Sequence, residues 1–110
     1  MPDYKDSLEV FIQEMKKSTV YTEYMLQRDN LRKYPELKKQ VDDYRQKNFA
    51  LQTQTYPDQL FDEIDRFQKE YEEFRENPVV HDFLAAELAF CRMMQNIHLK
   101  LVDAVAFEFE

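Results

Sequence analysis

No glycine occurs among the 110 residues of this chain, and this absence restricts its possible folds more than any other feature. Glycine supplies the positive φ angles of tight hairpin turns, β-bulges and many phosphate-binding loops. Proline ends one helix and suits the first position of the next. After Pro2, the prolines are Pro35, Pro57 and Pro78. We therefore predict an all-α fold, a small helical bundle whose helices are separated by prolines.

Length and composition predict one soluble domain spanning residues 1–110. With 44% hydrophobic residues, the chain is too apolar to be disordered at a net charge of −7. An acidic surface repels phosphate groups, so direct nucleic-acid binding is not expected. The single cysteine, Cys91, suits a reducing cytoplasm. The chain has no signal-type apolar run and no stretch able to span a bilayer, so we expect a cytoplasmic protein without membrane insertion.

Capping residues and prolines divide the chain into five predicted helical segments. Asp6 is the predicted N-cap of the first segment, with Glu9 three residues later as in a capping box. Ser18 is the predicted N-cap of the second, which covers residues 20–34. Pro35 then opens the third segment.

The last two predicted segments are also marked by prolines. Residues 53–56 lack helical apolar spacing and are expected to form a loop. Pro57 opens the fourth segment, whose apolar residues share one face. Asn77 is a favoured cap and Pro78 a favoured first position, so the long C-terminal helix is predicted to begin here and to continue to Val105.

Charge is distributed unevenly along the chain. Residues 28–47 hold seven basic and four acidic residues, whereas residues 57–76 hold eight acidic and three basic residues. These opposite net charges suggest that the third and fourth segments lie alongside each other, as a hairpin or across subunits. The alternative is two ordinary solvated faces, because exposed ion pairs contribute little free energy.

The apolar stripe of the last helix predicts a homo-oligomer. This helix would be roughly 40 Å long, whereas a compact domain of this size has a radius of gyration of about 13 Å. Apolar surface that extends beyond a monomer core needs a second chain to cover it. The alternative is a longer, flatter monomer bundle. The predicted interface residues are Phe83, Glu87, Phe90, Met94, Ile97, Leu101 and Val105.

Four residues form a polar file on the last helix, Glu87, Cys91, Gln95 and His98. A metal or redox site would need three or four convergent ligands at known spacings, which this file lacks. The simpler interpretation is a buried Glu87 with a donor partner, a Cys91 that packs as a small hydrophobe, and a His98 at a helix contact. We therefore expect no metal and no cofactor. The candidate donors to Glu87 are Tyr21, Tyr24 and Arg28.

Sequence motifs for catalysis are also missing. A chain without glycine has no phosphate-binding loop of the P-loop type, no Rossmann turn and no nucleophile elbow. Ser7 and Ser18 stand at cap-like positions, with no histidine close in sequence to either. We therefore expect a protein that is not an enzyme.

Several short segments occur in a distinctive order along the chain. They are 16–18 (KKS), 21–24 (YTEY), 34–37 (YPEL), 67–71 (FQKEY), 76–80 (ENPVV) and 83–88 (FLAAEL). They combine helix punctuation with an Asn-Pro-x-Val segment followed by an Ala-Glu pair that ends in Glu87. Over about residues 8–105, this order resembles the YlbF/YmcA family of small cytosolic bacterial helical proteins, which includes YheA-type members.

This resemblance implies an all-helical, oligomeric regulator. Some family members act in competence, sporulation and biofilm formation as partners of the membrane-bound endoribonuclease RNase Y. Some carry extra cysteines in complexes that hold iron–sulfur clusters, but this chain has only Cys91, so cluster binding is not carried over.

The sequence therefore predicts a non-enzymatic helical adaptor that acts through protein–protein interaction, in control of RNA processing, competence, sporulation or biofilm formation as the resemblance implies. Its expected partners are copies of itself and other proteins, among them an RNase Y-associated complex. One alternative is a helical scaffold or chaperone-like oligomer unrelated to RNA decay. Another is a metal- or redox-active bundle that would bind metal through Cys91, His98 and Glu87.

Overall fold

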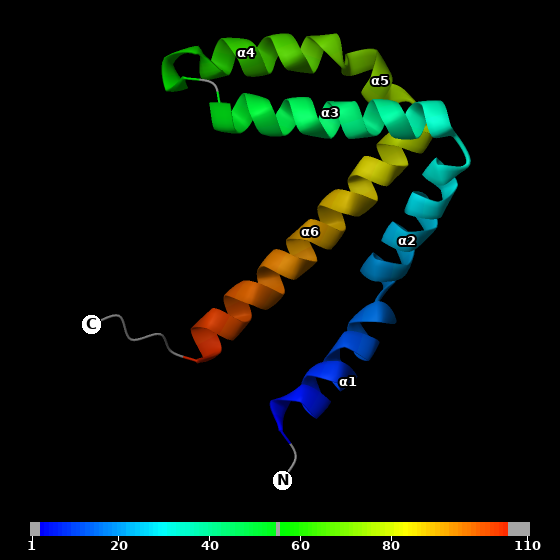
Figure 1. Cartoon of the computed structure of the whole chain (residues 1–110), viewed down its shortest axis with the longest axis vertical. Coiled ribbons are helices and arrows are strands. Elements are labelled where there is room, and N and C mark those ends of the chain that lie inside the picture. The colour runs from blue at the N-terminus through cyan, green and yellow to red at the C-terminus, as the bar shows by residue number, and fades with distance from the viewer. Residues whose placement is uncertain (1–2, 55, 106–110) are drawn as a thin grey trace.

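The computed structural model describes residues 3–54 and 56–105, and it is all-helical over these residues (Figure 1). Within them, no strand occurs and a long C-terminal helix is present, as predicted. The helices are α1 (Tyr4–Lys16), α2 (Thr19–Arg32), α3 (Pro35–Gln54), α4 (Pro57–Glu70), α5 (Glu72–Glu76) and α6 (Pro78–Ala104).

Most helix starts follow the local signals in the sequence. Ser18 caps α2, because its Oγ accepts a hydrogen bond of 3.1 Å from the Tyr21 backbone N–H. Asn77 caps α6 in the same way, with Oδ1 accepting from the Val79 N–H at 3.0 Å. Helices α3, α4 and α6 each begin with a proline, as predicted.

The first helix begins earlier than predicted. Asp3, not Asp6, is its N-cap, and Asp3 Oδ1 accepts a 2.7 Å hydrogen bond from the Tyr4 N–H. Asp6 lies in the first turn of α1, where a negative charge stabilises the positive end of the helix dipole. The predicted capping box of Asp6 and Glu9 was therefore wrong.

The predicted loop at residues 53–56 is shorter than expected. Thr53 and Gln54 end α3, and Thr53 Oγ1 donates a 2.8 Å hydrogen bond to the Phe49 carbonyl one turn earlier. Thr55 lies outside the described residues, and Tyr56 is the N-cap of α4. The Thr53 hydroxyl is thus hydrogen-bonded within the helix, which continues through Gln54.

The predicted fourth segment is interrupted at Tyr71, which separates α4 from α5. Arg75 bridges the interruption, since its Nη2 donates to the Gln68 carbonyl at 2.8 Å and its Nε to the Tyr71 carbonyl at 3.4 Å. The Tyr71 carbonyl also accepts a 3.0 Å hydrogen bond from the Arg75 backbone N–H, so Arg75 links both sides of the break. The break redirects the chain from α4 into α6.

Helices α3 and α4 form an antiparallel hairpin, which we call the arm (Figure 1). The hairpin was predicted from charge, but aromatic packing holds it together. The Tyr44 ring of α3 lies 5.2 Å from Phe67, 5.2 Å from Tyr71 and 5.6 Å from Phe74. The ion pairs recorded within α4 are Arg66–Glu63 and Lys69–Asp65, so neither joins it to α3.

The main core lies where α2, α3 and α6 meet. Its buried residues are Leu31, Val41, Val80 and Phe83. From this junction α2 packs along the first half of α6, whereas α1 and the end of α6 diverge toward the two termini (Figure 1). The chain is flat, with extents of 55 × 43 × 16 Å, and its radius of gyration is 18.3 Å.

Candidate interaction surface

The apolar stripe of α6 divides into two halves with different surroundings. In the first half, Phe83 is only 3% exposed. Phe90 is half-buried and stacks on Tyr24 of α2 at a ring distance of 4.8 Å. These residues are covered by α2 of the same chain, so Phe83 belongs to the monomer core. Sequence spacing alone placed both of them in the predicted oligomer interface.

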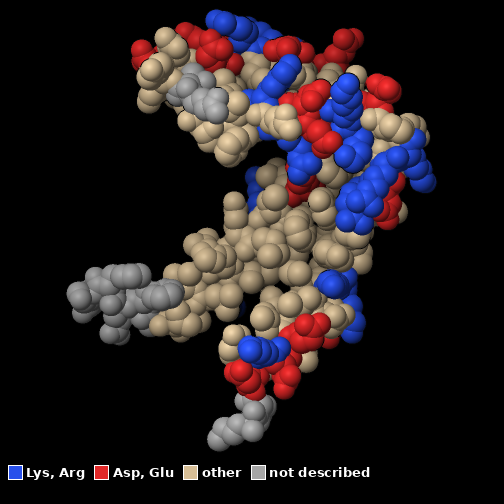
Figure 2. Space-filling view, viewed as in Figure 1, with Lys and Arg blue, Asp and Glu red and all other residues tan. Residues whose placement is uncertain are grey.

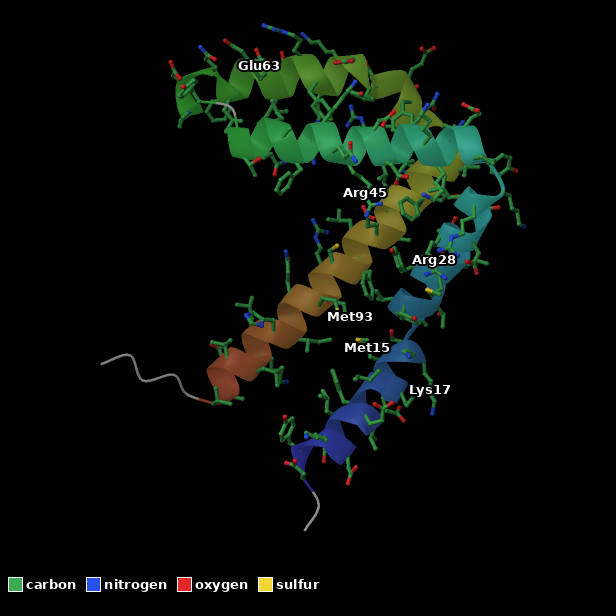
Figure 3. The ribbon with its side chains drawn as sticks, viewed as in Figure 1. Met15, Lys17, Arg28, Arg45, Glu63 and Met93 are labelled. Atoms are coloured by element: carbon green, nitrogen blue, oxygen red, sulfur yellow. The ribbon has the colours of Figure 1, made fainter. Side chains whose placement is uncertain are left out.

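The second half of the stripe is uncovered. Met94, Leu101 and Val105 are exposed, and Ile97 is half-buried. The reason is the length of α2, whose cap residue Ser18 lies at the height of Met93, with Oγ 3.8 Å from Sδ. Figure 3 shows Met93 of α6 at this junction between α1 and α2. Beyond Met93, α1 is the one helix of the described residues that lies near α6 (Figure 1).

An apolar groove lies between α1 and the end of α6. It encloses about 540 Å³. The sequence indicated the apolar face of α1 but gave no reason to pair it with α6. We call this surface the α1–α6 groove; it is lined by Tyr4, Ser7, Leu8, Phe11, Ile97, Lys100, Leu101 and Ala104.

Charged side chains are sparse over the second half of α6. Figure 2 shows Lys, Arg, Asp and Glu side chains gathered over the arm, over the corner between α2 and α3, and over α1. On the same face, the surface over the second half of α6 is almost free of them (Figure 2). An uncovered apolar surface of this kind is typical of a site that binds another protein.

Glu87 on α6 lies beside α3, the first helix of the arm. Its side chain is 19% exposed, and Oε2 lies 2.8 Å from Nη2 of Arg45 on α3. The two opposite charges are in contact, but Oε2 accepts no hydrogen bond from the described residues. Figure 3 shows Arg45 extending from α3 toward α6. The Arg45 guanidinium also lies 6.0 Å from the Phe83 ring centre.

Burial and charge act on Glu87 in opposite directions. Burial raises the pKa of this carboxyl, the Arg45 guanidinium lowers it, and the Asp42 carboxylate raises it. The net effect is a pKa above the ordinary value of 4.5. Glu87 has a charged partner, as predicted, but it is partly rather than fully buried, and the partner is not one of the predicted donors. The candidates Tyr21, Tyr24 and Arg28 lie on α2, and Arg28 pairs with its neighbour Asp29 at 3.5 Å.

The remaining members of the predicted polar file are solvent-exposed. Cys91 is an exposed free thiol, so the prediction that it packs as a buried hydrophobe was wrong. Gln95 and His98 are exposed too. Over residues 3–54 and 56–105, no three His, Cys, Asp or Glu side chains are grouped closely enough to hold a metal ion.

The geometry defines a class of protein, an open helical protein with an uncovered apolar groove. Residues 4–106 match the sequence profile of a family described as "Control of competence regulator ComK, YlbF/YmcA". The chain therefore belongs to the YlbF/YmcA family, as the sequence resemblance predicted, and this is a regulatory family by its description. No curated protein and no solved structure matches the chain. None of the described helices combines the length and the apolarity needed to cross a membrane.

Proposed function

We propose that this protein is a non-enzymatic adaptor that acts by binding proteins through the α1–α6 groove. One observation carries the proposal. The chain exposes 9075 Å² of surface, whereas a compact monomer of 13.5 kDa exposes about 6,500 Å². The difference is larger than the roughly 800 Å² that each partner buries in a standard protein interface.

The first occupant we propose for this groove is a second copy of the chain. The end of α6 is apolar on the side that faces α1, with Ile97 and Leu101 in the groove, and Leu99 is exposed on its other side. Two such helix ends can cover each other in a bundle. The oligomer would then be formed by the second half of the predicted interface, from Met94 to Val105, together with α1.

The family description supports a regulatory role, because it names control of the competence regulator ComK. Within that role we propose that the protein contributes to RNA processing, competence, sporulation or biofilm formation, through a complex that contains RNase Y. An adaptor needs stable surfaces rather than a reactive centre, and the surface described here is apolar and shallow. The competing proposal is a helical scaffold or chaperone-like oligomer without a specific cellular partner.

Two neighbouring leucines of α6 provide a matched test. Leu101 lines the groove and is 60% exposed, whereas Leu99 is 58% exposed on the opposite side of the helix. Tagged wild type, Leu101→Glu and Leu99→Glu should be expressed in the cells that encode the protein and captured under gentle conditions. Quantitative mass spectrometry then compares the proteins retained by each form.

We expect one or a few proteins retained by wild type and Leu99→Glu and lost from Leu101→Glu, because a charge in an apolar interface is costly. Circular dichroism should be the same for the three forms, since both leucines are exposed in the single chain. Equal retention by all three forms, or no specific protein retained by wild type, would contradict the adaptor. Retention of many unrelated unfolded proteins would favour the chaperone-like scaffold.

A further inference from the structure

The free end of the arm exposes three large aromatic side chains. Phe49 on α3 is 68% exposed, Tyr56 at the start of α4 is 73% exposed, and Phe61 on α4 is 82% exposed. Phe49 lies five residues before Gln54, the last residue of α3, and Phe61 lies four residues after Pro57, the first residue of α4. At about 1.5 Å per helical residue they therefore lie at about the same level of the hairpin. We call these three residues the arm tip.

Packing of the arm does not require the arm tip. The rings that join the two helices are Tyr44, Phe67 and Tyr71, which lie nearer the other end of the hairpin. Leu51 and Leu60, which lie nearer the free end than Phe49 and Phe61, are half-buried. Phe49 and Phe61 are exposed outside this packed seam, so they contribute little to the fold of the single chain. Aromatic side chains are, however, the residues most enriched at the centres of protein interfaces.

Acidic residues surround the arm tip on α4. Asp58 and Asp62 are exposed, and neither has an ion-pair partner among the described residues. Over residues 57–76 there are eight acidic and three basic residues. This negative charge repels nucleic acids and anionic membrane surfaces. It favours a partner that carries positive charge beside apolar side chains.

A second copy of the chain fits this requirement less well. Its most basic stretch is residues 28–47, with seven basic and four acidic residues. Many of the cations there are already paired within the chain, among them Arg32 with Asp29 at 3.8 Å, Lys38 with Asp42 at 2.9 Å and Arg45 with Glu87 at 2.8 Å. These pairs favour a different protein as the source of the charge complement, and contact between copies is one outcome of the test below.

We propose that the arm tip docks a basic amphipathic helix of another protein, with Phe49 and Phe61 contacting its apolar side and Asp58 and Asp62 contacting its cations. The inference rests on the proposed adaptor function, because it adds a second binding surface to the same chain. Together the groove and the arm tip would let one chain hold two partners at once, since they lie at opposite ends of the structure (Figure 1).

Binding can be measured with a defined probe. The probe is a fluorescein-labelled helical peptide of about 18 residues made of Lys and Leu, and its control has Glu in place of Lys. Fluorescence anisotropy should be recorded for the full chain and for the double variant Phe49→Ser/Phe61→Ser. The matched control is Leu26→Ser/Tyr34→Ser, which removes two exposed large side chains that belong neither to the arm tip nor to the groove. A separate groove variant, Tyr4→Ser/Phe11→Ser, reports whether the peptide binds the groove instead.

The contribution of charge is tested with a second pair of variants. Asp58→Asn/Asp62→Asn removes two negative charges beside the arm tip. Glu72→Gln/Glu76→Gln removes the same charge from α5, at the other end of the arm. Titrations at about 50 and 200 mM salt show how much of the affinity is electrostatic.

We expect saturable binding of the Lys/Leu peptide and none of the Glu/Leu peptide. The Phe49→Ser/Phe61→Ser change should weaken binding by about tenfold or more, because it removes both apolar anchors. The Asp58→Asn/Asp62→Asn change should weaken it several-fold and reduce its salt dependence. Both control variants should bind within about twofold of wild type, the usual limit of surface changes outside a contact.

Three results would overturn the inference. One is wild-type affinity in Phe49→Ser/Phe61→Ser, and another is equal binding of the two peptides. The third is loss of self-association in Phe49→Ser/Phe61→Ser by light scattering, which would make the arm tip a contact between copies. If the groove variant alone loses the Lys/Leu peptide, the inference about the arm tip fails while the adaptor function remains supported.

Discussion

Arg45 on α3 and Glu87 on α6 form the one ion pair that joins two helices among the described residues, with Nη2 and Oε2 2.8 Å apart. The other ion pairs link residues that are at most four positions apart in sequence. Arg45 also lies 6.0 Å from the ring centre of Phe83, a core residue. This pair therefore contributes to the angle at which the arm leaves α6, beside the apolar core.

The raised pKa of Glu87 predicts a dependence of stability on pH. Because its pKa is higher in the folded chain than the ordinary 4.5, the folded state holds the proton more tightly than the unfolded state does. The stabilisation that this provides is present below pH 4.5 and is lost as pH rises through the folded pKa. The effect should be less than about 1 kcal/mol, since Arg45 is half-exposed and solvent screens the pair.

Glu87→Gln isolates this effect, because it keeps the shape of the side chain and removes the titration. In urea unfolding at pH 7, the variant should be at least as stable as wild type. As the pH falls from 7 to about 4.5, wild type should gain stability relative to the variant. Arg45→Met should enlarge the pH dependence, since it removes the group that lowers the Glu87 pKa. If the difference in unfolding free energy between Glu87→Gln and wild type does not change with pH, the raised pKa of Glu87 is contradicted.

The α1–α6 groove predicts which surface joins copies of the chain. Leu8→Glu, in the groove, should dissociate an oligomer, because the charge would be buried in an apolar interface at a cost of several kcal/mol. Val10→Glu is the matched control, as Val10 is an exposed residue of the same helix outside the groove. Light scattering at micromolar concentration gives the mass of each form. A monomeric wild type would contradict the prediction of an oligomer.

The exposure of Cys91 predicts a reactive and structurally unimportant thiol. Cys91→Ala should change the free energy of unfolding by less than about 0.5 kcal/mol, as is usual for surface positions. A thiol reagent should modify the folded wild type at a rate close to that of the unfolded chain. If Cys91 is protected only in the assembled oligomer, then the interface extends along α6 beyond the groove. Protection in the monomer as well would contradict its exposed position.

Two leucines of α2 distinguish the core from the surface. Leu31→Ala should destabilise the chain by about 2–5 kcal/mol, because Leu31 is buried against Val41 and Val80 and its truncation leaves a cavity. Leu26→Ala should cost less than about 0.5 kcal/mol, since Leu26 is exposed on the same helix. Chemical denaturation measures both. Similar losses for the two variants would mean that the exposed side of α2 is covered by another chain.

Local signals in the sequence were sufficient for most of the secondary structure. Pro35, Pro57 and Pro78 each begin a helix, and Ser18 and Asn77 each cap one. These signals act within one or two turns, so they need no tertiary structure to operate. The family resemblance, which depends on the same punctuation, was also confirmed. The error at the start of α1 was also local, since Asp3 and Asp6 are both acceptable caps for this helix.

Tertiary structure alone decided which apolar residues of α6 are covered. Phe83 and Leu101 occupy the same stripe and are equivalent by spacing, yet Phe83 is 3% exposed and Leu101 is 60% exposed. The difference arises because α2 covers α6 only as far as Met93. Helical periodicity specifies a face of a helix, but it contains no information on how far a neighbouring helix extends along it.

Local sequence patterns were enough to predict an all-helical chain and the prolines at which α3, α4 and α6 begin. They did not predict that Arg45 is the partner of Glu87, that Cys91 faces solvent, or that α1 forms a groove with α6. The reason is the distance along the sequence over which each interaction acts. Caps, prolines and apolar spacing act between neighbours in sequence, whereas the partner of a charge and the cover of a face depend on the angles at which helices cross.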